Sequence, residues 1–265
     1  MSQLKRTNKI GPQETHPSND GPQGKPLLPI TPGLLTERPL LLKSKLCIPR
    51  PRPNLVPRPH LVQKLDSALQ RPLTSVTALA GFGKTALLTE WATQSTCHVT
   101  WVSLDPSDNG AFQFWAYLTA ALQKLDQNPR EGLLFLLQPL DEKHTKLFLS
   151  ALLNQVSDLP EGSVLILDDY DVIKSDLIHE GMTFFIDHLP PQLHIIIASR
   201  SIPTVATARL RVRVQLLKLT KDDLGFTVQE ASEFFYRAGI QNLSSQDVAR
   251  LNAETEGWVA GLRGT

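Results

Sequence analysis

The chain has 265 residues, 41% of them hydrophobic, and a formal net charge of +1, so one or two domains with a sizeable core are expected and strong electrostatic attraction to nucleic acid or membrane is excluded. No apolar run reaches the roughly 18 residues that predict a membrane span, and we expect no signal peptide because the N-terminus lacks an apolar segment. Two cysteines, Cys47 and Cys97, make no disulfide framework, which is typical of a cytoplasmic protein.

Residues 1–42 are predicted to form a disordered, Pro-rich tail. The stretch 1–40 is rich in Pro, Gly, Gln, Ser and Asn and has few aromatic residues. Such a composition cannot bury enough apolar surface to offset the entropy lost on ordering. We therefore expect the tail to be dispensable for ligand binding and to be the first part removed by a protease.

An extended arm is predicted between Lys43 and Arg58. Its prolines impose extended backbone and exclude a helix. Pro59 suits the first turn of a helix, and the apolar residues that follow over 61–69 recur with helical period. The arm therefore leads directly into the first predicted helix.

The next stretch, Ala-Leu-Ala-Gly-Phe-Gly-Lys-Thr at 78–85, predicts a P-loop. A β-favouring run precedes it and a helix-permissive segment follows, which is the context that a P-loop requires. Glycines let backbone N–H groups surround phosphate oxygens, and the N-terminus of the following helix favours the same anion. Lys84 is expected to neutralise the β- and γ-phosphates, and Thr85 to give its hydroxyl to Mg²⁺.

One residue departs from the strict P-loop pattern, because Ala78 stands where the first glycine is usual and carries a Cβ that disfavours positive φ. A simple glycine turn between strand and helix is the alternative interpretation. The P-loop also leaves two roles open for the arm before it: closing over an adenine, or packing on the edge of the sheet as a strap.

A strand over 99–104 and amphipathic helices over about 114–125 and 143–157 are predicted next. Four consecutive apolar residues at 164–167 then predict a strand buried on both faces. Asp168 and Asp169 follow at its carboxyl end, where parallel α/β sheets bind ligands. Asp168 fits the role of holding Mg²⁺ and Asp169 that of polarising the attacking water; an acidic turn is the alternative.

Another buried strand is predicted over 194–198, with Arg200 near its carboxyl end. An arginine there can bind a γ-phosphate bidentately, although a surface arginine is the simpler interpretation in isolation. A fifth strand is predicted over 214–217. The remainder is predicted to be helical, with a capping box at 227–230, a helix ended by Gly239 and a last helix over 246–256.

These elements suggest a P-loop domain over 43–219 and the start of a small helical lid over 220–265. The apolar run after Gly257 has the pattern of a helix that has only begun. We therefore expect the polypeptide to be part of a longer protein.

Taken in order, several segments resemble the NTPase domain of MalT-type regulators, which are ATP-dependent LuxR-type transcription factors of the STAND class of AAA+-like NTPases. The matching segments are Leu-Val-Pro-Arg-Pro at 55–59, Ala-Gly-Phe-Gly-Lys-Thr at 80–85, Trp-Val-Ser-Leu-Asp at 101–105, Leu-Asp-Asp-Tyr at 167–170, Ala-Ser-Arg at 198–200, Ala-Arg-Leu-Arg at 208–211, Phe-Thr-Val-Gln-Glu-Ala at 226–231 and Glu-Gly-Trp-Val-Ala-Gly-Leu at 256–262. The resemblance covers about 43–262.

The resemblance implies an α/β P-loop NTPase fold with a five-stranded parallel sheet in the order 5-1-4-3-2, flanked by helices. It implies that ATP or ADP, with Mg²⁺, acts as a switch that controls self-association. DNA recognition would come from a C-terminal helix-turn-helix that this sequence does not contain.

The resemblance also assigns site residues. The arm ending at Arg58 would lie over the adenine, and an Ala commonly opens the loop in this family. The nucleotide would contact a continuous set of loop residues: Ala80, Gly81, Phe82, Gly83, Lys84, Thr85 and Ala86. Two positions depart from the family: Ala86 lacks a second hydroxyl and should not touch Mg²⁺, and Asp171 stands where a histidine is common.

The leading hypothesis is a regulatory ATPase module of a transcription factor, with slow hydrolysis acting as a timer. A general P-loop ATPase or kinase is the first alternative. A kinase needs a lid of basic residues, and the only cluster of basic residues is Arg209, Arg211 and Arg213, which are more simply solvated charges that flank a strand. The second alternative is a degenerate fragment that binds nucleotide without switching. The measured turnover of ATP distinguishes the regulatory module from a general ATPase or kinase. The measured nucleotide affinity identifies a degenerate fragment.

Overall fold

The computed structural model describes residues 40–51, 55–67, 69–126, 132–137, 142–203, 205, 216–240 and 242–262. The chain divides into two compact units, Met1–Glu37 and Arg38–Thr265, and every described residue belongs to the second. Almost all of the predicted tail and the segment 208–211 lie outside the described residues. No helix in the described part of the chain is long and apolar enough to cross a bilayer.

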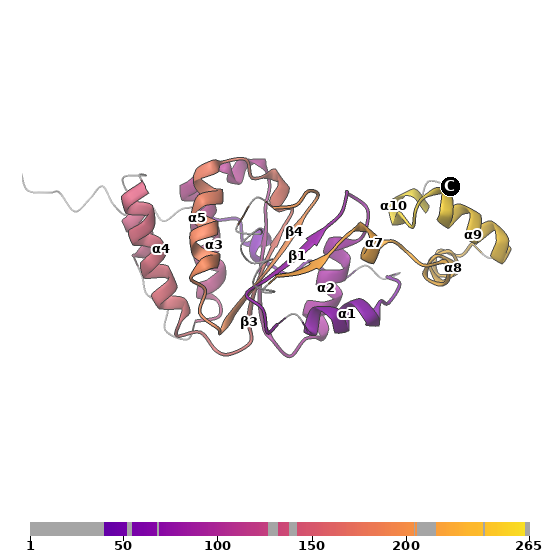
Figure 1. Cartoon of the computed structure of the whole chain (residues 1–265), viewed down its shortest axis with the longest axis horizontal. Helices are drawn as coiled ribbons and strands as arrows, with labels where there is room; N and C mark the ends of the chain where they lie inside the picture. Colours follow the sequence, from indigo (N-terminus) through magenta and orange to yellow (C-terminus); the bar gives the residue numbers. More distant parts are fainter. Residues whose placement is uncertain are drawn as a thin grey trace, which may run out of the picture. The chain divides into compact units, whose positions relative to one another are not determined.

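Five parallel strands form one sheet in the order β2-β3-β4-β1-β5, which confirms the order 5-1-4-3-2 (Figure 1). The strands are β1 (Leu73–Thr77), β2 (His98–Ser103), β3 (Ser163–Asp168), β4 (Leu193–Ser199) and β5 (Leu216–Leu219). Thr77 pairs with Ser199, and Ser103 pairs with Asp168. The carboxyl ends of the strands therefore meet at one edge of the sheet.

The central strands are buried because both faces of the sheet are covered. Alternate residues of a strand point to opposite faces. In β3, Leu165 and Leu167 join a core with helices α3 (Ala111–Gln123), α4 (Glu142–Val156) and α5 (Asp176–Asp187). Val164 and Ile166 join a second core with α1 (Pro59–Asp66) and α2 (Lys84–Gln94) on the other face (Figure 1).

The first part of the arm is a strap on the sheet edge. The short helical turn η2 (Lys43–Leu46) packs beside β2, which is an edge strand. Lys45 donates to Asp108 at 2.7 Å in the turn η3 (Pro106–Asn109), and the backbone N–H of Leu42 donates to the hydroxyl of Tyr117 at 3.1 Å. The strap interpretation therefore applies to this segment. Two further turns are η4 (Leu133–Leu137) and η5 (Tyr170–Val172).

The segment predicted to begin a lid, called the lid below, contains the helices α7 (Lys221–Leu224), α8 (Val228–Arg237), α9 (Ser245–Glu254) and α10 (Val259–Leu262), coloured orange to yellow in Figure 1. It has a core of its own, formed by Ala231, Phe234, Phe235, Val248 and Leu262 together with Val56 from the arm. The capping box is confirmed, because the hydroxyl of Thr227 accepts from the backbone of Glu230 and the carboxylate of Glu230 accepts from the backbone of Thr227.

Helix α9 ends two residues earlier than predicted. Glu256 and Gly257 adopt left-handed backbone, with φ of 49° and 70°. Only glycine fits at 257, because a Cβ there would lie 2.5 Å from the backbone nitrogen of Phe226. The early end turns the chain back toward the sheet before α10 begins.

Candidate nucleotide-binding site

The loop between β1 and α2 has the backbone that phosphate binding requires. Gly81 and Gly83 have φ of 87° and 80°, which residues with a Cβ rarely adopt. Ala78 is buried and is not among the residues with positive φ, so its Cβ carries no conformational penalty. Gly83 caps the N-terminus of α2, where the helix dipole favours an anion.

Lys84 spans this loop from its position at the start of α2. Its ammonium group donates to the carbonyl of Ala78 at 2.7 Å and to that of Leu79 at 3.2 Å. Burial lowers the pKa of Lys84, while the carboxylates of Asp169, Asp171 and Asp168 oppose that lowering. Lys84 is 6% exposed. It places a positive charge at one end of the cavity described below.

Thr85 and Asp168 lie side by side, as expected for two oxygen ligands of one Mg²⁺ ion. The hydroxyl of Thr85 donates to Oδ2 of Asp168 at 2.8 Å, and the backbone N–H of Asp169 donates to Oδ1 at 3.1 Å. Burial raises the pKa of Asp168 to about 6, against the lowering effect of the Thr85 hydrogen bond. A buried carboxylate beside a hydroxyl is a donor set that fits Mg²⁺, which prefers oxygen ligands.

Asp169 turns the chain sharply after β3. Its φ of 56° and ψ of 37° place it in the left-handed region, which Asp enters more readily than most residues. Such backbone costs of order 1 kcal/mol and is concentrated at functional sites. Asp169 lines the cavity, whereas the next residue, Tyr170, is buried against Phe114.

Arg200 follows β4 and is held by Asp171. The backbone N–H of Arg200 donates to Oδ1 of Asp171 at 2.9 Å, and Nε lies 3.4 Å from Oδ2. The guanidinium is more than half exposed and lines the same cavity as Lys84 and Asp169. The structure thus brings both predicted catalytic residues to the carboxyl edge of the sheet.

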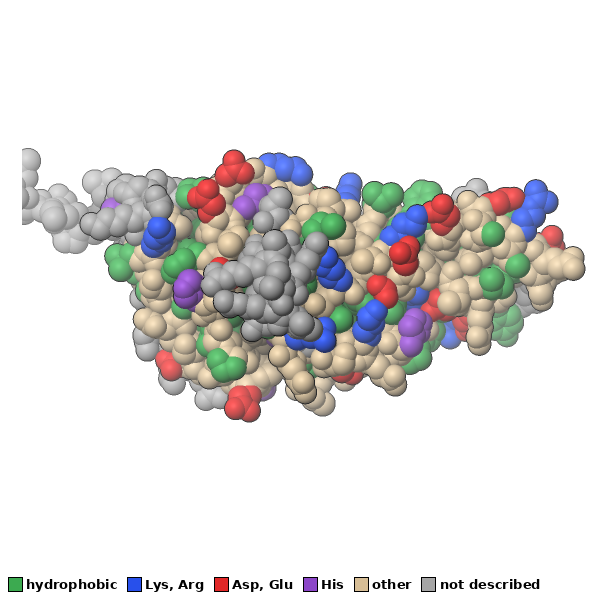
Figure 2. Space-filling model, viewed as in Figure 1, with side chains coloured by type: hydrophobic (Ala, Val, Ile, Leu, Met, Phe, Trp, Pro, Cys, Tyr) green, Lys and Arg blue, Asp and Glu red, His purple; other side chains and the backbone are tan. Residues whose placement is uncertain are grey.

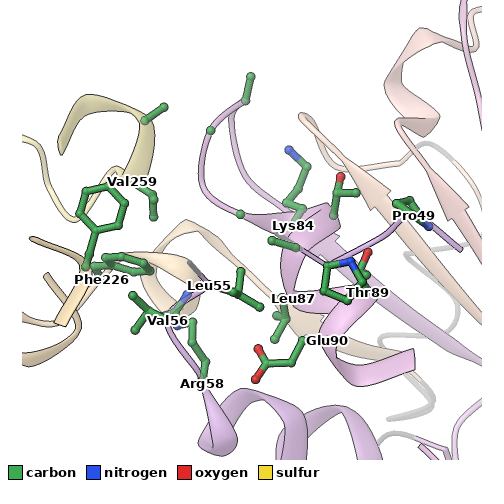
Figure 3. A pocket seen from close by; sticks show the side chains of 18 of the residues that line it. Pro49, Leu55, Val56, Arg58, Lys84, Leu87, Thr89, Glu90, Phe226 and Val259 are labelled. Carbon is green, nitrogen blue, oxygen red and sulfur yellow. The ribbon is translucent and has the colours of Figure 1, made fainter. Parts of the chain in front are cut away.

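The cavity has a volume of about 590 Å³, within the range of small-molecule sites. Its charged end contains Lys84, Thr85, Asp169 and Arg200. Its other end is lined mainly by apolar side chains, with Arg58 and Glu90 beside them: Leu55 and Val56 of the arm, Leu87 of α2, and Phe226 and Val259 of the lid (Figure 3). One charged end and one apolar end match a ligand with phosphates and a flat base.

Arg58 lines the cavity, but its guanidinium is engaged with the lid. Nε donates to Oε1 of Glu230 at 2.8 Å, and the terminal nitrogens donate to the carbonyls of Leu224 at 2.7 Å and Gly225 at 3.0 Å. Arg58 and Glu230 are 6% and 9% exposed. Leu55 and Val56, which precede Arg58, provide the apolar surface at this end.

The lid also contacts the phosphate loop directly. The indole N–H of Trp258 donates to the carbonyl of Ala80 at 2.8 Å, and the backbone N–H of Ala260 donates to the carbonyl of Gly81 at 3.3 Å. A Cβ on Gly81 would lie 2.5 Å from the Cβ of Ala260. Gly81 therefore serves both the turn and this close approach.

No family model matches the chain. The chain is 41% identical over 228 residues to the HTH-type transcriptional regulator MalT of Serratia proteamaculans, and 40% identical over the same length to MalT of Yersinia pestis. Each match covers 84% of this chain and 25% of the relative, so the chain spans about a quarter of their length. The MalT regulators are its homologues.

A solved structure resembles the chain in fold. A STAND protein with a tetratricopeptide repeat sensor from Pyrococcus horikoshii superposes with a TM-score of 0.52 and 15% identity, over 84% of this chain and 31% of that chain. At this identity the likeness concerns the fold alone. The sheet order, the loop at 78–85 and this likeness together make the chain a P-loop NTPase in fold.

Of the two departures from the MalT pattern, Ala86 lines the cavity and Asp171 contacts Arg200, which does. Ala86 lines the cavity in the first turn of α2, where it offers a backbone N–H and no hydroxyl. Asp171 provides the partner of Arg200. Ala80 and Gly81 also line the cavity, while the side chain of Phe82 is buried in the core beneath the loop.

Sequence reasoning missed several residues that build the site. No sequence pattern assigned these residues to the site, beyond the family segments or the helix cap to which some belong. They are Phe226, Trp258, Ala260, Glu90 and Glu230, whose carboxylate binds Arg58 as well as capping α8. Burial raises the pKa of Glu90 on α2, and a hydrogen bond from the backbone of Arg58 works against that rise. These residues come from segments far apart in sequence, so their meeting could not be derived from spacing.

Proposed function

We propose that this chain is an ATP-binding regulatory module of a longer MalT-type regulator, that it hydrolyses ATP slowly, and that its nucleotide state switches self-association. The observation that carries the proposal is the meeting of Lys84, the Thr85–Asp168 pair, Asp169 and Arg200 at one end of a cavity whose other end is apolar. The cytoplasm, where ATP is abundant, is the expected location, and DNA would be bound by a C-terminal helix-turn-helix outside this sequence.

Each residue at the charged end has a role that suits its chemistry. Backbone N–H groups of residues 80–86 would surround the phosphates, and Lys84 would neutralise the β- and γ-phosphates. Thr85 and Asp168 would hold Mg²⁺, which supplies positive charge to the phosphate oxygens when bound. Asp169 would orient and polarise the attacking water, and Arg200 would bind the γ-phosphate.

The apolar end would accept the base. Leu55 of the arm and Phe226 and Val259 of the lid line this end (Figure 3), and Val56 of the arm packs in one apolar cluster with both lid residues. An adenine between these side chains would touch arm and lid at once. A nucleotide bound there would stabilise one arrangement of the two, and a change in arrangement is what a switch needs.

Isothermal calorimetry of ATP binding tests the proposal. The variant Lys84→Ala should weaken ATP binding by at least about tenfold, or about 1.4 kcal/mol. Lys146→Ala, an exposed lysine on α4, is the matched control and should leave the affinity unchanged. Equal affinity of the Lys84 variant and the unmodified chain would contradict the nucleotide assignment.

A further inference from the structure

Arg58 stands where the arm joins the core. Pro59 begins α1, which packs beside α2 on one face of the sheet. Two residues before Arg58, the side chain of Val56 is inserted into the lid core with Ala231 and Phe234. Val56 thus packs in the core of the lid, whereas α1, which begins three residues later, packs on the sheet. Arg58 lies between the two.

The guanidinium of Arg58 is hydrogen-bonded to two parts of the lid, the first turn of α8 and the end of α7. It accepts no hydrogen bonds and donates to the carboxylate of Glu230 through two nitrogens, at 2.8 Å and 3.2 Å. It also donates to carbonyls at the end of α7, those of Asp223 at 3.3 Å, Leu224 at 2.7 Å and Gly225 at 3.0 Å. The planar fork suits several acceptors in fixed directions, which a lysine cannot match.

The ring of Phe226 lies 5.2 Å from the guanidinium carbon. Phe226 is also one wall of the base end of the cavity. Glu230, the main partner of Arg58, caps the first turn of α8 with the same carboxylate. Arg58 therefore contacts both the carboxylate that caps α8 and this aromatic wall.

A link to the phosphate end runs through the backbone of Arg58. Glu90 lies on α2, the helix that begins with Lys84 and Thr85, and the backbone N–H of Arg58 opposes the rise that burial causes in the pKa of its carboxyl. Glu90, Arg58 and Phe226 all line the cavity. The P-loop helix, the arm and the lid are thus joined through one buried residue.

We propose that Arg58 is a positioning residue, which fixes the lid against the P-loop helix and so shapes the base end of the cavity without itself binding the nucleotide. This inference rests on the proposed function. Since its side-chain donors are committed to the lid, the base would be bound by the neighbouring residues of the arm. Removing one member of a buried pair leaves the other charge uncompensated, so either substitution should loosen the lid.

The experiment compares Arg58→Gln, Glu230→Gln and the double variant in the full chain. Arg250→Gln and Glu254→Gln, from an exposed pair on α9, are the matched controls. Without nucleotide, amide hydrogen exchange of α8 should accelerate at least about tenfold in both single variants. The double variant should be little worse than either single variant, because the two residues act as a pair. Exchange in β3 and β4 reports whether each variant is folded.

With nucleotide, ATP and ADP affinities should fall by the same factor in both single variants, because the phosphate end is untouched. The Michaelis constant for ATP should rise, while turnover at saturating ATP stays within about twofold. The inference would be overturned if Arg58→Gln lost nucleotide affinity while hydrogen exchange in α8 stayed unchanged, and if Glu230→Gln bound nucleotide as tightly as the unmodified chain. If Arg58→Gln does not fold, Glu230→Gln decides by the same measurements.

The failure of the proposed function would look different. An unmodified chain that binds no nucleotide would refute the proposed function. The exchange comparison without nucleotide would still decide whether Arg58 positions the lid.

Discussion

Asp168 is a carboxylic acid in a position that disfavours its charge. Burial raises its pKa to about 6, from an ordinary value of 3.8. Between these two pH values the folded chain binds more protons than the unfolded chain, so stability contributed by this group is present below pH 3.8 and is lost as the pH rises through 6. At pH 8 the loss is at most about 3 kcal/mol.

Asp168→Asn should therefore stabilise the chain at pH 8 without Mg²⁺, by about 1–3 kcal/mol in urea denaturation, and the difference should vanish near pH 4. The same variant should abolish the effect of Mg²⁺ on ATP affinity. A variant that is less stable than the unmodified chain at pH 8 would show that the carboxylate is stabilised by partners more strongly than burial destabilises it.

Asp169→Asn should act on hydrolysis and not on binding. Asn tolerates the left-handed backbone of position 169, so the turn after β3 should be retained. ATP affinity should stay within about twofold, while turnover falls by about 10² or more, because water activation is used only in the chemical step. Asp222→Asn, an exposed acid of α7, should change neither quantity. Lost affinity with an unchanged rate per bound nucleotide would reverse the roles of Asp168 and Asp169.

Two glycines of the phosphate loop provide a comparison at the scale of elements. Gly81 and Gly83 both have left-handed backbone, so alanine at either should cost about 1 kcal/mol. Only at Gly81 would the new Cβ meet the lid, at 2.5 Å from Ala260 and from the indole nitrogen of Trp258, whereas nothing lies within 4 Å at Gly83.

Gly81→Ala should therefore displace α10 and Trp258, and Gly83→Ala should not. Trp91, Trp101 and Trp115 are buried and Trp258 is 41% exposed, so acrylamide quenching of tryptophan fluorescence reports on Trp258. Quenching should increase in Gly81→Ala alone. Equal quenching in both variants would mean that the contact of α10 with the loop does not depend on Gly81.

The strands and the phosphate loop could be predicted because their signals are local. The apolar run at 164–167 predicts a strand buried on both faces, and the segment 83–85 marks the start of α2. The Arg58–Glu230 pair could not be predicted, since 172 positions separate its members and the cap of α8 already accounted for Glu230. The end of α9 was missed because Glu256, unlike glycine, gives no sign of left-handed backbone.

For the whole molecule, weak and non-specific binding of duplex DNA is expected. The net charge is +1, and Figure 2 shows basic and acidic side chains interspersed on one face. Helices α8 and α9 carry Glu233, Asp247 and Glu254 with accessible side chains, which would face phosphates of like charge. Fluorescence anisotropy at about 0.15 M salt, where charges are screened over ~8 Å, measures the binding. Saturable, sequence-dependent binding at nanomolar protein would contradict this expectation.

The enclosure of the cavity by the arm and the lid has a consequence for how the chain is made. A ribosome adds about 5–20 residues per second, so roughly 9–34 seconds pass between the synthesis of Arg58 and that of Glu230, which lies 172 positions later. Throughout that interval Val56 and Arg58 have no lid to pack against. The β1 loop and β3 emerge well before the lid, so the phosphate end can assemble while the base end is still open. An emerging chain therefore cannot have its complete cavity until α10, which carries Val259 and Ala260, has left the ribosome.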